Sequence, residues 1–109
     1  MTKLPEGMAI PGPWTSIEEV RAHHRNRRVD WFDAGPYFGT RVETGMLEGR
    51  LFLTSEQFEP SEGEPWERRW TVRAVHDDGW IETVGPFYEL TSAEAVELAR
   101  ALVDERRGQ

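Results

Sequence analysis

The spacing of apolar residues changes once along this chain, and this change most constrains its fold. Between Phe38 and Leu90, apolar residues repeatedly alternate with polar ones, which is the period of a half-buried β-strand. From Thr91 to Arg107 they recur at helical spacing. Strand periods followed by a helix period predict an α+β domain, in which the helix covers one face of an antiparallel sheet.

The first half of the strand region predicts a hairpin. Alternation runs from Phe38 to Thr44, and Glu48-Gly49 follows as a two-residue turn. That turn places Met46 opposite Leu51, so the apolar side chains of both strands share one face.

A second hairpin is expected at Asp78-Gly79, which is a strong turn signal. Residues 66–76 alternate, and a two-residue loop places His76 opposite Ile81. This register gathers one apolar set for the C-terminal helix to cover: Trp70, Val72, Ala74 and Ile81.

Two helices flank the strands. Thr15 and Ser16 both offer N-caps, with Glu18 and Glu19 three positions after each. This capping-box pattern predicts a helix over residues 17–27. Thr91 and Glu94 repeat the pattern before the second helix. That helix carries an apolar stripe: Ala95, Val96, Ala99, Leu102 and Val103.

We therefore expect an α+β fold in the order helix, four-stranded antiparallel meander, C-terminal helix, with the last helix packed on one sheet face. Residues 1–14 are rich in Pro and Gly and predict an extended leader before a single domain over residues 15–109. Residues 55–67, rich in acids and Pro, predict an exposed loop between the hairpins.

The segment Tyr88-Glu-Leu-Thr-Ser-Ala-Glu-Ala-Val-Glu-Leu-Ala-Arg-Ala-Leu102 joins a strand end to the capped helix. It resembles the ending of small uncharacterised actinobacterial and actinophage proteins, in which a strand precedes a helix of the L-T-x-x-E-A type. The resemblance covers this segment alone and implies neither an activity nor any site residue.

The charge balance narrows the classes of partner. The chain holds 13 Lys+Arg against 20 Asp+Glu, a formal net charge of −7. Because phosphate neutralisation supplies most non-specific affinity for nucleic acid, this balance disfavours a general nucleic-acid binder and favours a basic partner. With no apolar run of membrane-span or signal-peptide length, we expect a cytoplasmic protein that does not enter a membrane.

The sequence contains no recognisable catalytic or metal-binding constellation. The absence of Cys excludes disulfides and cysteine-ligated metals. His23 and His24 are adjacent and diverge by about 100° on a helix, and His76 is remote, so they make a poor zinc set. No Gly-x-Ser-x-Gly elbow or glycine-rich phosphate loop is present. We expect no enzyme, no metal and no cofactor.

One stretch departs from the acidic balance, because residues 21–28 hold four arginines. These candidate binding residues are Arg21, Arg25, Arg27 and Arg28. On a helix, three of them share one face and could grip phosphate or an acidic partner. Alternatively, they only offset the helix dipole at its C-terminal end. Both interpretations stay open.

A second candidate site lies on the sheet face away from the C-terminal helix. In the predicted register this face carries Phe52, Trp80 and Arg73. Either it is an exposed apolar patch, which marks a partner surface, or the first helix and Trp14 cover it. Aromatic rings beside arginines would also suit single-stranded nucleic acid.

These features favour a small acidic, non-catalytic module that acts through protein–protein interaction, as a regulator, an inhibitor or a phage-type accessory protein. The expected partner is another protein or a second copy of the chain, because the fold leaves edge strands unpaired. The alternative is a nucleic-acid-binding accessory protein that uses the Arg-rich helix.

Overall fold

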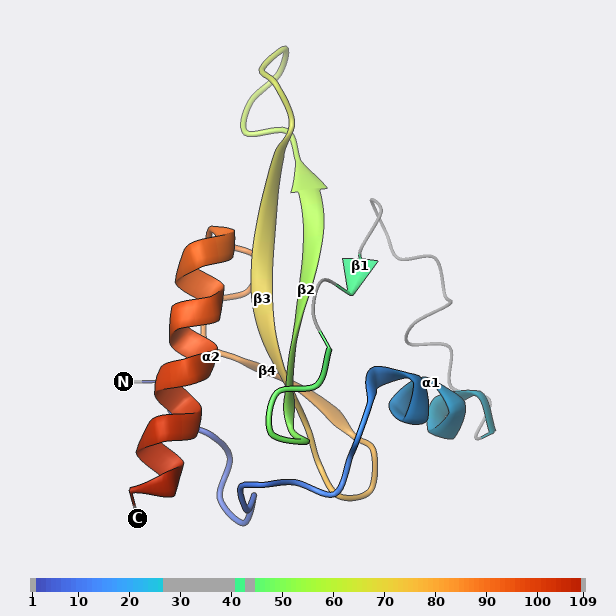
Figure 1. Ribbon diagram of the computed structural model, residues 1–109. Coiled ribbons are helices and arrows are strands. Elements are labelled where there is room, and N and C mark those ends of the chain that lie inside the picture. Colours follow the sequence, from blue (N-terminus) through green and yellow to red (C-terminus); the bar gives the residue numbers. More distant parts are fainter. Residues whose placement is uncertain (1, 27–40, 43–44, 109) are drawn as a thin grey trace.

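The computed structural model describes residues 2–26, 41–42 and 45–108. Its elements are α1 (Ile17–Asn26), β1 (Arg41–Val42), β2 (Leu51–Phe58), β3 (Glu67–Val75), β4 (Ile81–Val84) and α2 (Ser92–Arg107). The α+β class and the antiparallel pairing are confirmed, and the two helices lie on opposite sides of the strands (Figure 1). No helix within these residues is long and apolar enough to cross a bilayer.

Three strands, β2, β3 and β4, form an antiparallel sheet in chain order, and the two residues of β1 pair with the outer side of β2. Val42 of β1 lies opposite Thr54. Most of the predicted first strand over residues 38–44 falls outside the described residues, so a full fourth strand stays a prediction.

The turn at Glu48-Gly49 is present, with φ angles of 52° and 68°, but the predicted pairing of Met46 with Leu51 is wrong. Leu47 pairs with Leu51 instead. The Leu47 carbonyl accepts from the backbone N–H groups of both Arg50, at 3.1 Å, and Leu51, at 3.0 Å. Arg50 is therefore an extra residue on one side of the hairpin, which shifts the register.

The predicted pairing of His76 with Ile81 is also wrong by one residue, since Val75 lies opposite Ile81. The turn has three residues, because the backbone N–H of His76 donates to the Trp80 carbonyl at 2.8 Å. Gly79 supplies the left-handed conformation, with φ of 93°, that a three-residue hairpin loop favours. A slip of one residue exchanges the two faces of a strand, so Ile81 packs away from α2.

α2 covers one face of the sheet, as predicted. The Thr91 hydroxyl accepts from the Glu94 N–H while the Glu94 carboxylate accepts from the Thr91 N–H, which completes the capping box. The buried core beneath α2 joins sheet and helix residues: Leu51, Leu53, Val72, Ala74, Val84, Ala95, Ala99, Leu102 and Val103.

The extended N-terminal segment also belongs to this core. Leu4 and Met8 are only 6% and 3% exposed and pack in the cluster under α2. Arg106, in the last turn of α2, donates to the backbone carbonyls of Leu4 at 3.0 Å, Pro5 at 3.2 Å, and Met8. These bonds fix the segment against the helix.

A second, smaller core lies on the opposite face. Val20 of α1, Phe52 and Val75 are buried there, and Trp14 and Ile17 pack against them. The interpretation of Phe52 as part of an exposed patch is therefore wrong, because α1 and Trp14 leave it only 1% exposed.

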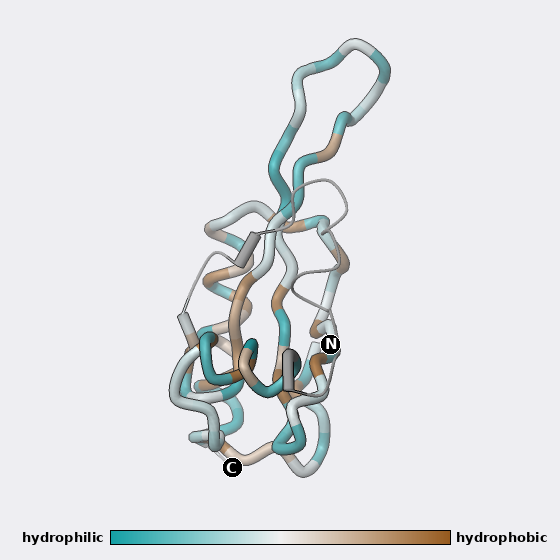
Figure 2. Tube along the Cα trace, turned by 90° about the vertical axis from the view of Figure 1, so that its right-hand side faces the viewer, coloured by the Kyte–Doolittle hydropathy of each residue, from teal (hydrophilic) through white to brown (hydrophobic). Residues whose placement is uncertain are grey.

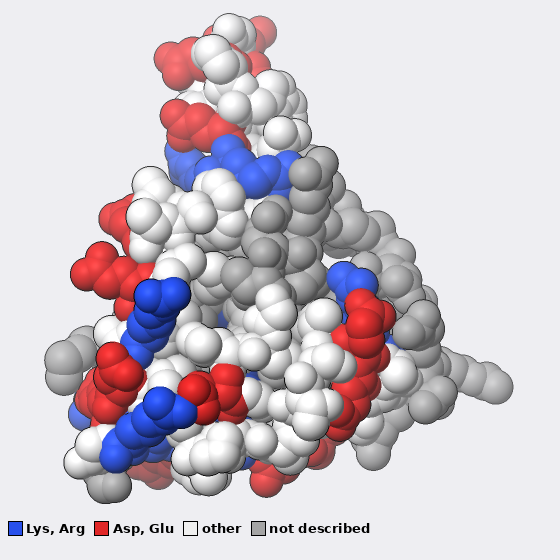
Figure 3. Space-filling model, in the orientation of Figure 1, with Lys and Arg blue, Asp and Glu red and all other residues white. Residues whose placement is uncertain are grey.

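β2 and β3 continue beyond both cores as a projecting ribbon (Figure 1). Residues 55–58 pair with residues 67–70, so the predicted loop over residues 55–67 shortens to residues 59–66, which are all exposed. The projecting end is mainly hydrophilic and carries acidic side chains (Figures 2 and 3).

Candidate interaction site

The structure describes only part of the predicted arginine strip. Arg21 forms an ion pair with Glu18, one helical turn away, with 3.1 Å between Nη1 and Oε1. The side chain of Arg25 and the whole of Arg27 and Arg28 lie outside what the structure describes. The strip as a binding site therefore stays a prediction.

Arg73 was expected on an exposed face, but it is buried, with 7% of its surface accessible. Its guanidinium donates to Thr54 Oγ1 at 3.1 Å, to the Tyr88 hydroxyl at 2.9 Å, and to Thr83 Oγ1. The Phe87 ring lies over it, 5.4 Å from the guanidinium carbon to the ring centroid. These contacts make Arg73 a structural residue of the sheet rather than an exposed binding residue.

The His23 and His24 rings lie edge-on with their centroids 5.8 Å apart, but the three histidines make different contacts. His24 Nε2 lies 2.9 Å from the Gly79 carbonyl oxygen, and the His23 ring packs edge-on against Trp14. His76 Nε2 instead lies 3.8 Å from a Glu82 carboxylate oxygen. Within the described ranges, no group of three His, Asp or Glu side chains could hold a metal ion.

Trp80 is exposed, with 65% of its surface accessible, which agrees with the exposed-patch alternative, but the register shift moves it off the face on which it was expected. It immediately precedes β4, and its backbone N–H donates to Asp78 Oδ1 at 3.0 Å. Phe87, which follows β4, is 61% exposed. Sequence reasoning missed Phe87 because Gly85-Pro86 interrupts the alternation from which faces were assigned.

β4 lies at the end of the strand order, and no strand in the described part of the chain pairs with its outer side. The backbone bond between His76 and Trp80 fixes which groups point outward. Bonded and non-bonded pairs alternate along an antiparallel ladder, so Arg73 and Thr83 form a non-bonded pair. The N–H and C=O of Thr83 therefore point to the open side.

We call β4, with Trp80 and Phe87 at its two ends, the aromatic edge. The chain around it is acidic, since residues 76–90 include four acids and no Lys or Arg. Asp77, Asp78 and Glu89 are exposed, and the Glu82 side chain is 44% exposed. The aromatic edge thus combines outward-pointing backbone groups, exposed rings and negative charge.

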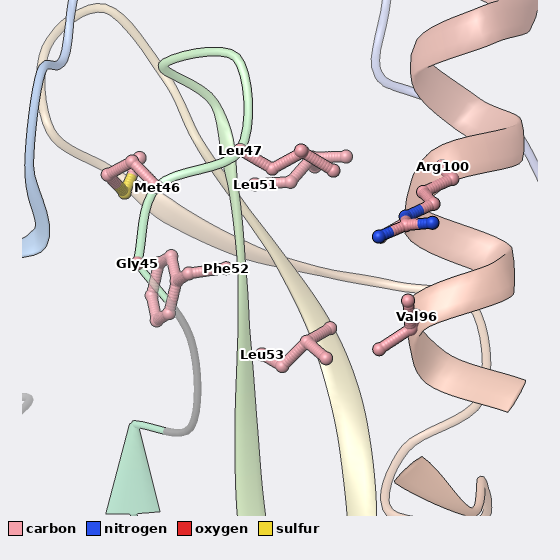
Figure 4. A pocket seen from close by; sticks show the side chains of 9 residues that line it. Gly45, Met46, Leu47, Leu51, Phe52, Leu53, Val96 and Arg100 are labelled. Atoms are coloured by element: carbon pink, nitrogen blue, oxygen red, sulfur yellow. The ribbon is translucent and has the colours of Figure 1, made fainter. Parts of the chain in front are cut away.

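A separate pocket lies between residues 45–47, the start of β2 and α2. Its volume is about 340 Å³. Residues 51–53 line it from β2, and Val96, Ala99 and Arg100 line it from α2. Among the lining residues that the structure describes, Arg100 alone is charged, and Figure 4 shows its guanidinium pointing from α2 toward the pocket. The sequence pattern placed Val96 and Ala99 in the apolar stripe of the helix and did not indicate a pocket there.

One family model matches residues 16–101, from the cap of α1 through most of α2, and its description is Family of unknown function (DUF7447). The chain belongs to this family. The match to DUF7447 includes α1, all the described strands and most of α2, but its description names no activity. No curated protein and no solved structure matched the chain.

Proposed function

We propose that this DUF7447 protein is a small non-catalytic binding module that takes an extended basic segment of another protein onto the aromatic edge. The observation that carries the proposal is the outer side of β4, which pairs with no strand that the structure describes and is bordered by exposed Trp80 and Phe87.

The open side favours an extended partner. A strand added to a sheet edge bonds to the outward N–H and C=O groups, which Thr83 offers here. Because β4 has only four residues, its backbone alone offers a short interface. Trp80 and Phe87 add ring area at its ends, and aromatic residues are the commonest anchors of protein interfaces.

The charge around the aromatic edge favours a basic partner. Asp77 is already paired with Arg50, but Asp78, Glu82 and Glu89 would attract Lys or Arg. An exposed Trp ring can also receive a cation on its face. A second copy of the chain would bring the same acids to the same edge and be repelled, so the proposal commits to a foreign protein.

A module of this kind fits a regulator, an inhibitor or a phage-type accessory protein. The resemblance of residues 88–102 to proteins of actinobacteria and actinophages supports the last role. An actinobacterial or actinophage origin of the chain is part of the proposal.

The test uses a peptide that alternates Val with Lys and a matched peptide that alternates Val with Glu. Each is titrated into the isotope-labelled protein while backbone amide signals are followed by NMR. We expect the Val/Lys peptide to shift the Ile81 and Thr83 amides and slow their hydrogen exchange. The Val/Glu peptide should leave both unchanged.

Two variants separate the backbone contact from side-chain effects. Thr83→Pro and Thr83→Val both remove the hydroxyl that Arg73 contacts, but only proline removes the outward N–H. We expect binding to be lost in Thr83→Pro and retained in Thr83→Val. Equal binding of the two peptides, no binding of either, or dimerisation in light scattering that Thr83→Pro abolishes would overturn the proposal.

A further inference from the structure

We infer that the pocket between residues 45–47, β2 and α2 binds a small apolar carboxylate, whose carboxylate group pairs with Arg100. This site is distinct from the aromatic edge and does not depend on the function proposed for it.

The pocket has the composition of a small-molecule site. Its deep wall is hydrophobic core, since Leu51, Leu53 and Ala99 are 0%, 3% and 4% exposed. Its mouth includes the exposed residues Gly45 and Arg100. Apolar walls with one or a few polar groups characterise ligand pockets, and about 340 Å³ falls at the small end of their size range.

The state of Arg100 identifies the polar end of the ligand. Glu97 and Asp104 lie at helical ion-pair spacing from it, yet Arg100 makes no hydrogen bond or ion pair with any residue that the structure describes. Its guanidinium points toward the apolar pocket instead (Figure 4). An anion that carries an apolar group would satisfy both the cation and the walls.

The chemistry of a single guanidinium favours a carboxylate over a phosphate. Its planar fork matches the two oxygens of one carboxylate in a bidentate pair. A phosphate carries more charge than one Arg neutralises, and no second Lys or Arg lines this pocket among the residues described. An apolar chain or ring on the carboxylate would lie against Leu47 and Val96.

The test uses sodium decanoate below its micelle concentration, with 1-decanol as an uncharged probe of the same length. Binding to the full chain is followed by NMR of methyl groups. We expect decanoate to shift the methyl signals of Leu47, Leu53 and Val96. The methyl signals of Val84 and Leu102, which lie in the same core but outside the pocket, should stay in place.

Arg100→Gln should weaken decanoate binding about tenfold, the loss expected for one charge-assisted contact, while the affinity for 1-decanol stays unchanged. Arg69→Gln is the matched control, because Arg69 pairs with Glu67 on β3 and lies outside the pocket. It should bind decanoate as the wild type does. Val96→Phe, which narrows the pocket, should weaken binding of both probes.

Three results would overturn the inference. One is the absence of any shift at the pocket methyls. Another is an Arg100→Gln variant that binds decanoate as tightly as the wild type. The last is an equal loss of affinity in Arg69→Gln, which would show that only net charge matters.

Discussion

Arg50 Nη1 lies 2.6 Å from Asp77 Oδ1, which ties the turn before β2 to the turn between β3 and β4. The two side chains differ sharply in exposure, at 3% for Arg50 and 75% for Asp77. Arg50 also donates from Nε to the Ala9 carbonyl at 2.9 Å and from Nη1 to the Val75 carbonyl at 3.1 Å. Arg50 therefore joins three separate segments, whereas Asp77 contributes one solvated contact.

This asymmetry predicts unequal losses of stability. Arg50→Ala removes the donor to two carbonyls and empties a buried site, so it should lower the free energy of unfolding by about 3 kcal/mol. Asp77→Ala removes one exposed partner and should cost less than about 1 kcal/mol. Urea denaturation of both variants measures the difference, and equal losses would contradict the buried role of Arg50.

Substitutions at Gly79 and His23 should have coupled effects on the free energy of unfolding. A Cβ at Gly79 would collide with the His23 ring, and the φ of 93° is unfavourable for any side chain. Gly79→Ala should therefore cost about 2–4 kcal/mol. In the His23→Ala background the collision disappears and only the backbone strain remains. A thermodynamic cycle should show a smaller cost there; strict additivity would refute this contact.

Truncation of Phe52 should cost much more stability than truncation of Trp80. Phe52→Ala empties the centre of the core beneath α1 and should lower the free energy of unfolding by about 3–5 kcal/mol. Trp80→Ala removes an exposed ring and should stay within about 0.5 kcal/mol of the wild type. Thermal unfolding compares the two, and a small effect at Phe52 would restore the exposed-patch interpretation.

The cap of α2 should weaken in acid. Hydrogen bonds with Thr91 lower the pKa of the Glu94 carboxyl below its ordinary value of 4.5. The bond with the Thr91 backbone contributes most, and the bond with its side chain contributes less. Because the pKa of this carboxyl is lower in the folded chain, its ionised form stabilises the fold when the pH is above the ordinary pKa. This stabilisation is lost as the pH falls through the lowered pKa.

Glu94→Gln provides the control, since Gln still accepts from the Thr91 N–H but does not titrate. We expect the stability difference between wild type and Glu94→Gln to be constant from pH 7 to about pH 5 and to shrink in stronger acid. Circular dichroism with urea at each pH measures it. A difference that grows in acid would reverse the sign and disprove the prediction.

The Arg-rich stretch can be tested directly. We expect a fluorescent single-stranded DNA to show no saturable binding at low salt, because the chain carries a net charge of −7 and Arg21 is paired with Glu18. Salt-sensitive binding that weakens in each of Arg21→Gln, Arg25→Gln, Arg27→Gln and Arg28→Gln would favour the nucleic-acid alternative over the function proposed above.

Features encoded in neighbouring residues could be predicted from the sequence. The α2 helix begins at its predicted cap because Thr91 and Glu94 satisfy each other's backbone groups without help from elsewhere in the chain. Its apolar stripe likewise specifies one buried face, and Ala95, Ala99 and Leu102 occupy it. Such local signals do not depend on the rest of the fold.

Strand register could not be predicted in the same way. Asp77-Asp78-Gly79 can close either a two- or a three-residue loop, and the choice depends on distant packing. Ile81 packs on the side of Val75 and Phe52, where α1 and Trp14 provide cover. A difference of one loop residue exchanges the faces of the strand, so local turn signals were insufficient.

The fate of the predicted site on the sheet face was harder still to predict, because segments distant in sequence cover its residues. Alternation placed Arg73 on the face away from α2, but Gly85-Pro86 redirects the chain so that Phe87 and Tyr88 cover it. The Tyr88 N–H then donates to Thr71 Oγ1 at 2.6 Å, which holds that cover in place. A strand period contains no information about such a return of the chain.

The bonds from Arg106 to the carbonyls of Leu4, Pro5 and Met8 have a consequence for biosynthesis. The segment that holds these carbonyls precedes Arg106 in the sequence, so it acquires these neighbours only after translation has passed Arg106. Until then Leu4 and Met8 remain without the α2 surface that later buries them. A nascent chain stalled before Arg106 would therefore expose this segment to proteases and chaperones.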